Sequence, residues 1–199
     1  MKAQLAWSVC IALALGRAQC AVVFPKAPEG GRNAVRTYTI GVLRYDPQFM
    51  RKFSFADLTV GQPFRNYYAG RTNIATGQLL SGARPGDWTY LLLHGTNAVG
   101  GATVKSDKGI GPVCTGLFQS NFASETLIAF DIAKKLPQTR NHDYEMRRLD
   151  VPTMHFVALW LHAPSDDILI PLSSMFNEVK LYEIYPEKDV TKILQAAAK

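Results

Sequence analysis

The stretch Thr89–Gly101, TYLLLHGTNAVGG, holds the residues whose order points most directly to chemistry. An apolar run leads into His94-Gly95, and then into a loop that ends in two glycines. Many hydrolases lead a buried strand into such a His-Gly turn, whose backbone N–H groups hold an oxyanion. His94 is therefore the first candidate catalytic residue, with the role of general base.

A hydrolase also needs a nucleophile, and the usual one is missing from this sequence. An α/β-hydrolase carries Gly-x-Ser-x-Gly after the His-Gly turn, whereas Ser106, Ser120 and Ser124 lack the flanking glycines. Cys114 is the remaining candidate nucleophile, and it would need a His partner. The simpler interpretation of His94 is that it ends a strand before a hairpin turn. A small hydrolase with a non-standard nucleophile stays open as the alternative function.

The acidic and histidine residues near residue 160 could in principle hold a metal ion. His162 and either Asp166 or Asp167 face each other across a polar turn, whereas His155 lies seven residues from His162 and points to the opposite face of one strand. A turn needs polar residues for its own conformation, which explains these residues without a metal. The Walker pattern and the strand–glycine–helix fingerprint of dinucleotide sites are also missing. We therefore expect no metal and no cofactor.

The charge of the chain is uneven along its length. The net charge is +6, and residues 19–86 hold nine Lys/Arg against three Asp/Glu, while residues 87–199 hold eleven against thirteen. Aromatic residues alternate with the basic ones in the first half, which is the composition of a nucleic-acid platform. A solvated face above an aromatic core explains the same residues. We favour that interpretation, and we do not expect nucleic acid as a partner.

Aromatic and arginine side chains dominate protein interfaces. On that ground Tyr67, Tyr68, Arg71 and Trp88 are the candidate binding residues for a protein or envelope partner.

The first twenty residues, MKAQLAWSVCIALALGRAQC, have the pattern of a secretory signal peptide. A positive start, a short apolar stretch and small residues at a −3/−1 spacing predict cleavage after Ala18 or after Cys20. We therefore expect the mature protein to be secreted or periplasmic, without a transmembrane span. Cleavage after Ala18 would leave Cys20 able to pair with Cys114; otherwise Cys114 is expected to be a small buried side chain.

The remaining pattern predicts a flexible arm over 21–33 and a single globular domain over 34–199. Within that domain we predict a strand over Tyr38–Tyr45, a weaker strand over Phe53–Val60 and mainly loop over Gly61–Asp87. A loop of that length is unusual in a compact domain, so it is either functional or misread.

Clearer signals follow. Trp88–His94 and Val99–Lys105 predict a hairpin, and Phe122–Leu136 predicts a helix that ends at Pro137. A second strand pair is expected at Val151–His162 and Ile168–Leu172. Val179–Tyr185 is ambiguous between strand and helix, and Pro186–Lys199 reads as a terminal helix.

Hairpins rather than alternating strand–helix–strand units indicate an α+β fold. We expect an antiparallel sheet built from hairpins, with one central helix and a C-terminal helix packed on it. A small exported α+β domain without an evident catalytic constellation is expected to be a non-enzymatic binding domain. Its expected partner is a protein or an envelope component, bound at the sheet, at its edge or at the segment Gly61–Asp87.

Overall fold

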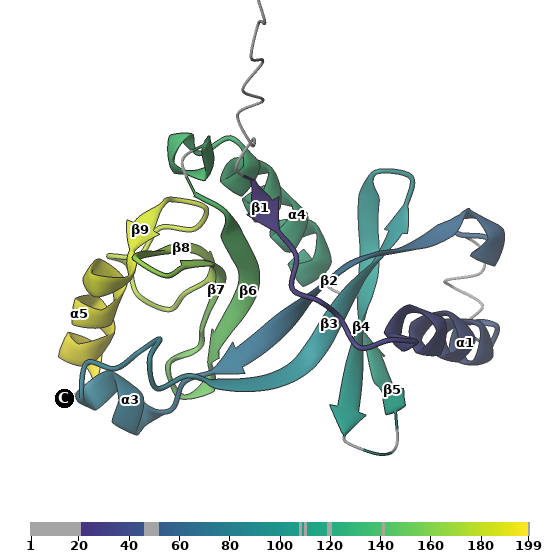
Figure 1. Ribbon diagram of the computed structural model, residues 1–199, viewed down its shortest axis with the longest axis horizontal. Coiled ribbons are helices and arrows are strands. Elements are labelled where there is room, and N and C mark those ends of the chain that lie inside the picture. Colours follow the sequence, from purple (N-terminus) through teal and green to yellow (C-terminus); the bar gives the residue numbers. More distant parts are fainter. Residues whose placement is uncertain are drawn as a thin grey trace, which may run out of the picture.

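The computed structural model describes residues 21–45, 52–107, 109, 111–118, 121–140 and 142–198. The signal peptide predicted over 1–20 lies outside these residues. The described part is α+β with a mostly antiparallel sheet, as the sequence predicts, and its helices pack on both faces of that sheet rather than on one (Figure 1). None of its helices has the length and apolar character needed to cross a membrane.

The sheet contains nine strands within the described residues. They are β1 (Val22–Val23), β2 (Leu58–Tyr68), β3 (Arg84–His94), β4 (Asn97–Asp107), β5 (Gly111–Phe118), β6 (Tyr144–Val151), β7 (Phe156–Ala163), β8 (Asp166–Ser173) and β9 (Tyr185–Pro186). The helices are α1 (Gly31–Leu43), α3 (Arg71–Ala75), α4 (Asn121–Lys134) and α5 (Glu187–Ala197), and short 3-10 turns lie at Phe55–Asp57, Pro137–Arg140 and Pro152–Met154.

Two antiparallel half-sheets meet at one parallel junction. The strand order is β5-β4-β3-β2-β6-β7-β8-β9, and neighbours within each half run antiparallel. At the junction, 65–68 of β2 pair in parallel with 147–150 of β6. The start of the same strand β6 pairs in parallel with β1 instead. The N-terminal segment therefore extends the sheet where β2 and β6 part from each other.

The sheet curves around α4, which contacts β4 in one half and β7 and β8 in the other. Three alanines of α4 are fully buried there, at Ala123, Ala129 and Ala133, and they pack with the apolar residues of the concave face. Small side chains let the helix come close to the strands. On the convex face, α1 covers the first half-sheet, and α3 and α5 cover the second.

The hairpin expected from the opening stretch is confirmed. Strands β3 and β4 pair from Trp88 opposite Val104 to His94 opposite Asn97. Gly95 in the turn has φ 59°, a left-handed conformation that glycine adopts without a steric penalty. The helix expected over Phe122–Leu136 and the terminal helix are also present, as α4 and α5.

The strand predicted over Tyr38–Tyr45 is wrong, because this segment belongs to helix α1 and the turn that follows it. Its buried residues Val35, Thr39 and Leu43 recur every four positions, which is the helical repeat. The alternating side chains that suggested a strand include Ile40 and Val42, and both of these are exposed. Packing against β4 and β5 thus outweighs the local β-propensity of the segment.

The loop predicted over Gly61–Asp87 is also wrong, because it contains most of β2, helix α3 and the start of β3. Pro63 concealed the strand in the sequence, and the structure accommodates it where the register of β2 and β3 shifts. Buried Asn66 and Thr89 exchange side-chain hydrogen bonds of 3.0 and 3.1 Å across these strands. The pairing that orders this segment is therefore non-local.

Three further segments refine the sequence reading. The strand expected over Val151–His162 is broken by the turn Pro152–Met154, and His155 has φ 44°. Strand β6 was not predicted at all, and Val179–Tyr185 lies outside helices and strands except for Tyr185, which begins β9. Within 21–33, where an arm was expected, Val22 and Val23 form β1 and 31–33 begin α1.

Candidate functional site

One row of side chains crosses the convex face at the junction of the two half-sheets. Trp88, Arg65, Arg147 and Trp160 are direct neighbours on β3, β2, β6 and β7, so their side chains point to the same face. The Arg147 guanidinium carbon lies 4.8 Å from the ring centres of both Tyr67 and Trp160. That of Arg65 lies 5.6 Å from the Trp88 ring. We call these five residues the cation–aromatic row.

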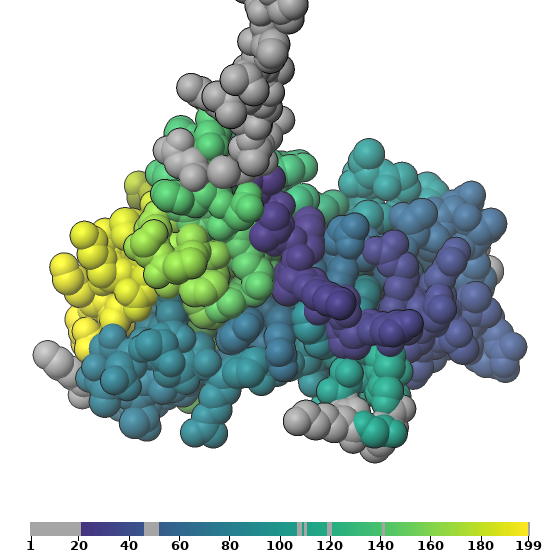
Figure 2. Space-filling model, viewed as in Figure 1, coloured from purple at the N-terminus to yellow at the C-terminus, as the bar shows by residue number. Residues whose placement is uncertain are grey.

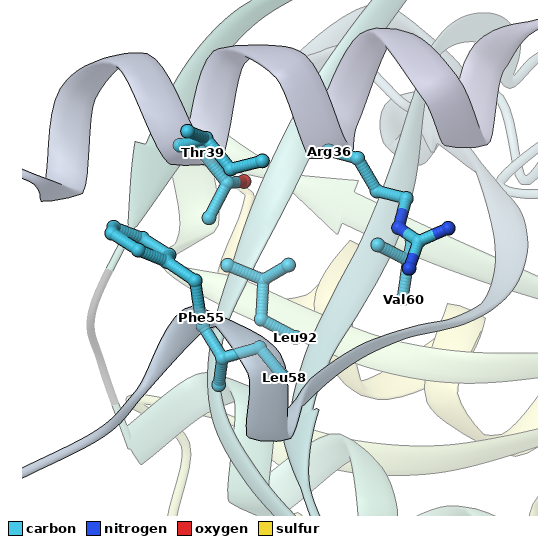
Figure 3. Close-up of a pocket in the computed structure, with 7 residues that line it drawn as sticks. Arg36, Thr39, Phe55, Leu58, Val60 and Leu92 are labelled. Carbon is cyan, nitrogen blue, oxygen red and sulfur yellow. The ribbon is translucent and has the colours of Figure 1, made fainter.

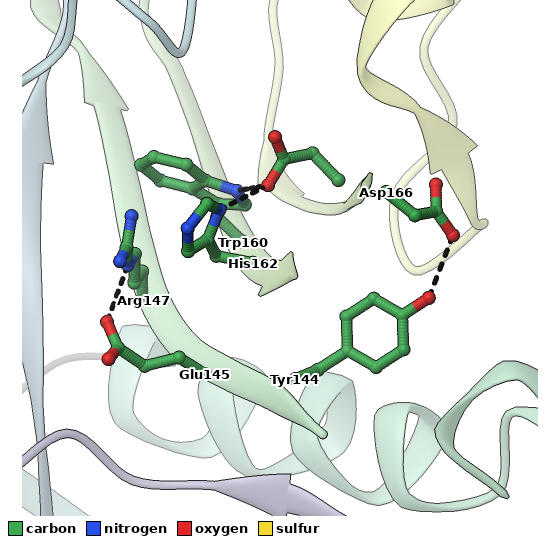
Figure 4. A network of polar contacts seen from close by, with 7 residues as sticks. Tyr144, Glu145, Arg147, Trp160, His162 and Asp166 are labelled. Carbon is green, nitrogen blue, oxygen red and sulfur yellow. Dashed lines mark hydrogen bonds and ion pairs between the residues drawn. The ribbon is translucent and has the colours of Figure 1, made fainter. Parts of the chain in front are cut away.

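Acidic residues complete this row (Figure 4). Arg147 Nε donates to Glu145 Oε1 at 2.6 Å. Trp160 Nε1 donates to Asp167 Oδ1 at 2.7 Å, and His162 Nδ1 lies 2.8 Å from the same oxygen. Arg147 and Trp160 are therefore satisfied by neighbouring side chains, and the network can stabilise the junction without a ligand.

The side-chain pair that the sequence placed across the polar turn does form, between His162 and Asp167. Asp166 has a different partner, because the Tyr144 hydroxyl donates to its Oδ2 at 2.8 Å. Burial, followed by this hydrogen bond, raises the pKa of Tyr144 to about 12. Among the described residues, no three His, Cys, Asp or Glu side chains come together in a way that could hold a metal ion.

A second arginine, Arg148, lies at the junction on the concave side. Arg148 pairs with Asp150 at 3.2 Å, and its guanidinium carbon lies 4.0 Å from the ring centre of Phe122. Burial lowers the pKa of Arg148 and raises the pKa of Asp150. It also raises the pKa of the nearby Tyr68 hydroxyl. Arg148 is thus held by a carboxylate and an aromatic ring, as Arg147 is on the convex face.

The structure separates the two catalytic candidates. His94 is half-buried at the end of the hairpin, and its ring packs 5.2 Å from the Phe53 ring. Cys114 lies opposite Val104, which pairs with Trp88, so six residues of β3 separate it from the level of His94. At roughly 3.4 Å per residue that is about 20 Å. Burial raises the pKa of the Cys114 thiol, which opposes formation of a nucleophilic thiolate.

The four candidate binding residues do not form one patch. Tyr67 and Trp88 belong to the cation–aromatic row, and Trp88 is only 8% exposed. Tyr68 follows Tyr67 on the same strand and points to the opposite face. Arg71, on α3, donates to the backbone carbonyl of Ala198 at 3.0 Å and so ties α3 to the end of α5.

A better-defined candidate site is an apolar pocket on the concave face, which we call the strap pocket. It has a volume of about 190 Å³ and lies between α4 and strands β2, β3 and β6. Its walls are nearly all hydrocarbon, and its lining residues are Phe24, Gly61, Gln62, Phe64, Leu91, Leu93, Thr126, Leu127, Phe130 and Met146. The Thr126 hydroxyl is already bonded to the Phe122 carbonyl at 2.8 Å.

The N-terminal segment 21–28, which we call the strap, runs from β1 beside α4 to the start of α1 (Figures 1 and 2), and its residue Phe24 lines the pocket. Its strand β1 is fixed on β6, and the Phe24 ring meets the Phe130 ring edge-on with centres 5.1 Å apart. A second, more polar hollow adjoins the strap and shares Phe24 and Gln62 with the strap pocket. Lys26 and Arg32 are among the residues that line it.

Arg32, at the start of α1, lies next to two residues that line the strap pocket, although it does not line the pocket itself. Its Nη2 atom lies 3.4 Å from the Gly61 carbonyl oxygen and 3.4 Å from Gln62 Oε1, and both residues line the pocket. Hydrogen bonds of this length are weak. No acidic side chain among the described residues forms an ion pair with Arg32. The rim therefore offers an exposed guanidinium next to an apolar interior.

A smaller hollow of about 70 Å³ lies between α1 and strands β2 and β3, lined mainly by apolar side chains (Figure 3). The Thr39 hydroxyl is buried beside it without a hydrogen-bond partner within the described part of the chain. A volume this small holds little more than a few water-sized groups, so the strap pocket is the stronger candidate.

Comparison with known proteins adds no function. No family model, curated protein or solved structure matches this chain. Sequence reasoning did not identify the strap pocket, since its walls come from five segments far apart in the chain. Gly61, predicted from the sequence to lie in a loop, lies in strand β2, and glycine in a strand often marks a close approach of a ligand or backbone.

Proposed function

We propose that this chain is an exported, non-enzymatic binding domain whose strap pocket takes a small amphiphile with an anionic head group. Of the two partner classes expected from the sequence, this is an envelope component rather than a protein. The observation that carries the proposal is the position of Arg32, whose Nη2 lies 3.4 Å from two residues that line the apolar pocket.

The volume of the pocket limits the apolar part of the ligand. A dry cavity of about 150 Å³ lined by apolar side chains binds benzene. The strap pocket, at about 190 Å³, is somewhat larger and similarly apolar. A ring or a chain of about six to eight carbons matches it. Each buried methylene contributes roughly 0.8 kcal/mol, which is about a fourfold gain in affinity per carbon until the pocket is full.

The charge at the rim selects the head group. A carboxylate placed at the Arg32 guanidinium accepts two charge-assisted hydrogen bonds, which are stronger than the weak bonds to neutral oxygens that Arg32 makes now. Lys26, in the adjoining hollow, adds a second positive charge. A monocarboxylate with a short acyl chain satisfies both the rim and the interior.

The test is titration of the protein with straight-chain carboxylates of four to twelve carbons, followed by calorimetry. Affinity is expected to rise with chain length to about eight carbons and then to level off or fall. Equal affinity at every length, or no binding at any length, contradicts the proposal.

Gly61→Val fills the pocket from its wall. A Cβ at Gly61 meets its nearest neighbours at 3.4 to 3.6 Å, so the strand accepts a side chain there without a severe clash. We expect at least tenfold weaker binding with little change in stability. Gly116→Val is the matched control, because it makes the same change in β5, where a Cβ meets nothing within 4 Å. Equal loss in both variants contradicts the assigned pocket.

Arg32→Gln tests the head group separately from the chain. Loss of the charge-assisted bonds is expected to weaken carboxylate binding about tenfold, while the alcohol of the same chain length binds as before. Arg36→Gln, one turn later on α1, is the control and should change neither. If Arg32→Gln weakens the alcohol as much as the carboxylate, the head-group assignment fails.

The export part of the proposal has its own test, which is fractionation of cells that express the full-length gene. The sequence predicts a shortened product outside the cytoplasm. An uncleaved cytoplasmic product contradicts export. The binding proposal is tested independently, by the titrations with carboxylates.

A further inference from the structure

The start of the described chain is fixed by one side chain. The Ala21 backbone nitrogen donates to Asp143 Oδ1 at 3.0 Å, and the Tyr144 nitrogen donates to the Ala21 carbonyl at 3.1 Å. These bonds join the first residue of the strap to the start of β6. Ala21 is also the residue that becomes the new N-terminus if the signal peptide is cleaved after Cys20.

We propose that cleavage occurs between Cys20 and Ala21, and that the new α-ammonium group of Ala21 forms an ion pair with Asp143 that holds the strap in place at its pocket. The proposal rests on the export part of the proposed function. A signal peptidase uses one water to hydrolyse the Cys20–Ala21 amide bond, which gives a carboxylate on Cys20 and an amino group on Ala21. At neutral pH that amino group is mostly protonated.

The geometry distinguishes the folded product of this cleavage from the product of cleavage after Ala18. With Gln19 as the first residue, the Ala21 nitrogen remains a neutral amide and keeps an ordinary hydrogen bond to Asp143. With Ala21 first, the same nitrogen carries a positive charge beside the carboxylate. Charge-assisted hydrogen bonds are roughly twice as strong as neutral ones. Asp143 would thus stabilise one product of processing more than the other.

The ion pair affects the pocket through the three strap residues that follow Ala21. Val22 and Val23 pair with Tyr144 and Glu145, and Phe24 then lines the pocket and packs on Phe130. Ala21 and Asp143 are both exposed, so the gain is that of a surface ion pair. We expect the strap to open about two- to fivefold less often when the pair is present.

The first measurement is the intact mass of the product exported from the full-length gene. The expected chain starts at Ala21. A chain that starts at Gln19 or elsewhere overturns the assigned cleavage site, although export itself would then be confirmed. The two proposals can therefore fail separately.

The second measurement is hydrogen exchange of segment 21–28 in the processed chain, with four samples that form a double-mutant cycle. The α-amino group is either free or acetylated, and residue 143 is either Asp or changed by Asp143→Asn. Acetylation removes the charge and keeps one N–H donor. It is expected to speed exchange about two- to fivefold with Asp143 in place, and to have no effect in the Asp143→Asn chain.

The control region is β7–β8, whose exchange should be the same in all four samples. Equal effects of acetylation in both backgrounds, or no effect in either, overturn the ion pair. High salt provides a further check, since the difference between free and acetylated chains should shrink as ionic strength rises.

Discussion

The two faces of the sheet differ where the half-sheets meet. On the convex face, Arg147 and Trp160 of the cation–aromatic row donate to Glu145 and Asp167, while Arg65 donates to the Gly86 carbonyl at 3.4 Å and lies over the Trp88 ring. On the concave face, the strap pocket has hydrocarbon walls and a guanidinium at its rim that has no carboxylate partner in the described residues. Polar residues thus gather in both places, but those of the row pack against aromatic rings of the row itself, whereas Arg32 adjoins two residues that line an apolar pocket.

This difference distinguishes polar side chains that stabilise the fold from polar side chains that could bind a ligand. A row of arginines and aromatics resembles a binding platform in the sequence, and the structure shows its members bonded to their own neighbours. A perturbation of the row should therefore change stability and leave ligand affinity alone. A perturbation of the pocket should do the reverse, or should change both in a way that follows ligand size.

The largest expected effect comes from Asp167→Ala, which breaks the row. It leaves the nearly buried Trp160 Nε1 without its acceptor and removes the partner of His162. The free energy of unfolding should fall by about 2–3 kcal/mol, measured by urea denaturation. Carboxylate affinity should stay within twofold of the wild type.

Asp131→Ala is the matched control for that change. Asp131 pairs with Lys134 on the surface of α4, where its side chain is 60% exposed. Loss of an exposed pair should cost under about 1 kcal/mol. Equal costs for the two variants would show that the row contributes no special stability.

Leu127→Ala enlarges the pocket from α4. Leu127 is half-buried, so the free energy of unfolding should fall by about 1–2 kcal/mol, less than for a fully buried leucine. The best carboxylate should become longer by about two or three carbons, the number that the substitution removes. An unchanged optimum in the calorimetric series would mean that the acyl chain does not lie against α4.

Thr39→Val is expected to stabilise the protein. The substitution removes a buried hydroxyl that has no partner and keeps the shape of the side chain. Unfolding should cost about 1 kcal/mol more, and ligand affinity should not change. A loss of stability would indicate that the hydroxyl is satisfied in solution, by water in the small hollow beside α1.

Tyr144→Phe is expected to change the free energy of unfolding least at neutral pH. Its effect should become visible at alkaline pH. The pKa of Tyr144 is raised from 10.0 to about 12 in the folded state, so its contribution to stability is complete below pH 10 and is lost as the pH rises towards 12. The phenylalanine variant lacks this loss. Between pH 10 and 12 the wild type should therefore lose free energy of unfolding relative to the phenylalanine variant; a difference that stays constant with pH contradicts the raised pKa.

The sequence predicted the local elements well and the junction poorly. The hairpin through Gly95 and the helix α4 were predicted because their turn residues and apolar repeats lie within one short window. Helix α1 was mistaken for a strand, since Tyr38, Ile40 and Val42 alternate although the buried positions are Val35 and Thr39. The sequence of one short segment does not show whether its helical or its strand periodicity places side chains in the core.

The candidate site was beyond sequence reasoning for a related reason. The contact of His162 with Asp167 could be predicted, because a short turn joins their strands. The pocket depends on Phe24, Phe64, Leu127 and Met146 meeting from four separate segments. Nothing in the spacing of these residues predicts that meeting, which only the parallel junction produces.

That junction also sets an order of events during folding. Within each half-sheet, strands that follow one another in the chain pair with each other, and most of their connections are short and close rapidly; the segment between β2 and β3, which contains α3, is the longest. The junction instead joins distant segments, and the bond from Ala21 to Asp143 spans 122 positions. We expect the two halves to form first and to associate in the rate-limiting step. Slow association of β2 with β6 would make the N-terminal strand one of the last pieces to reach its place.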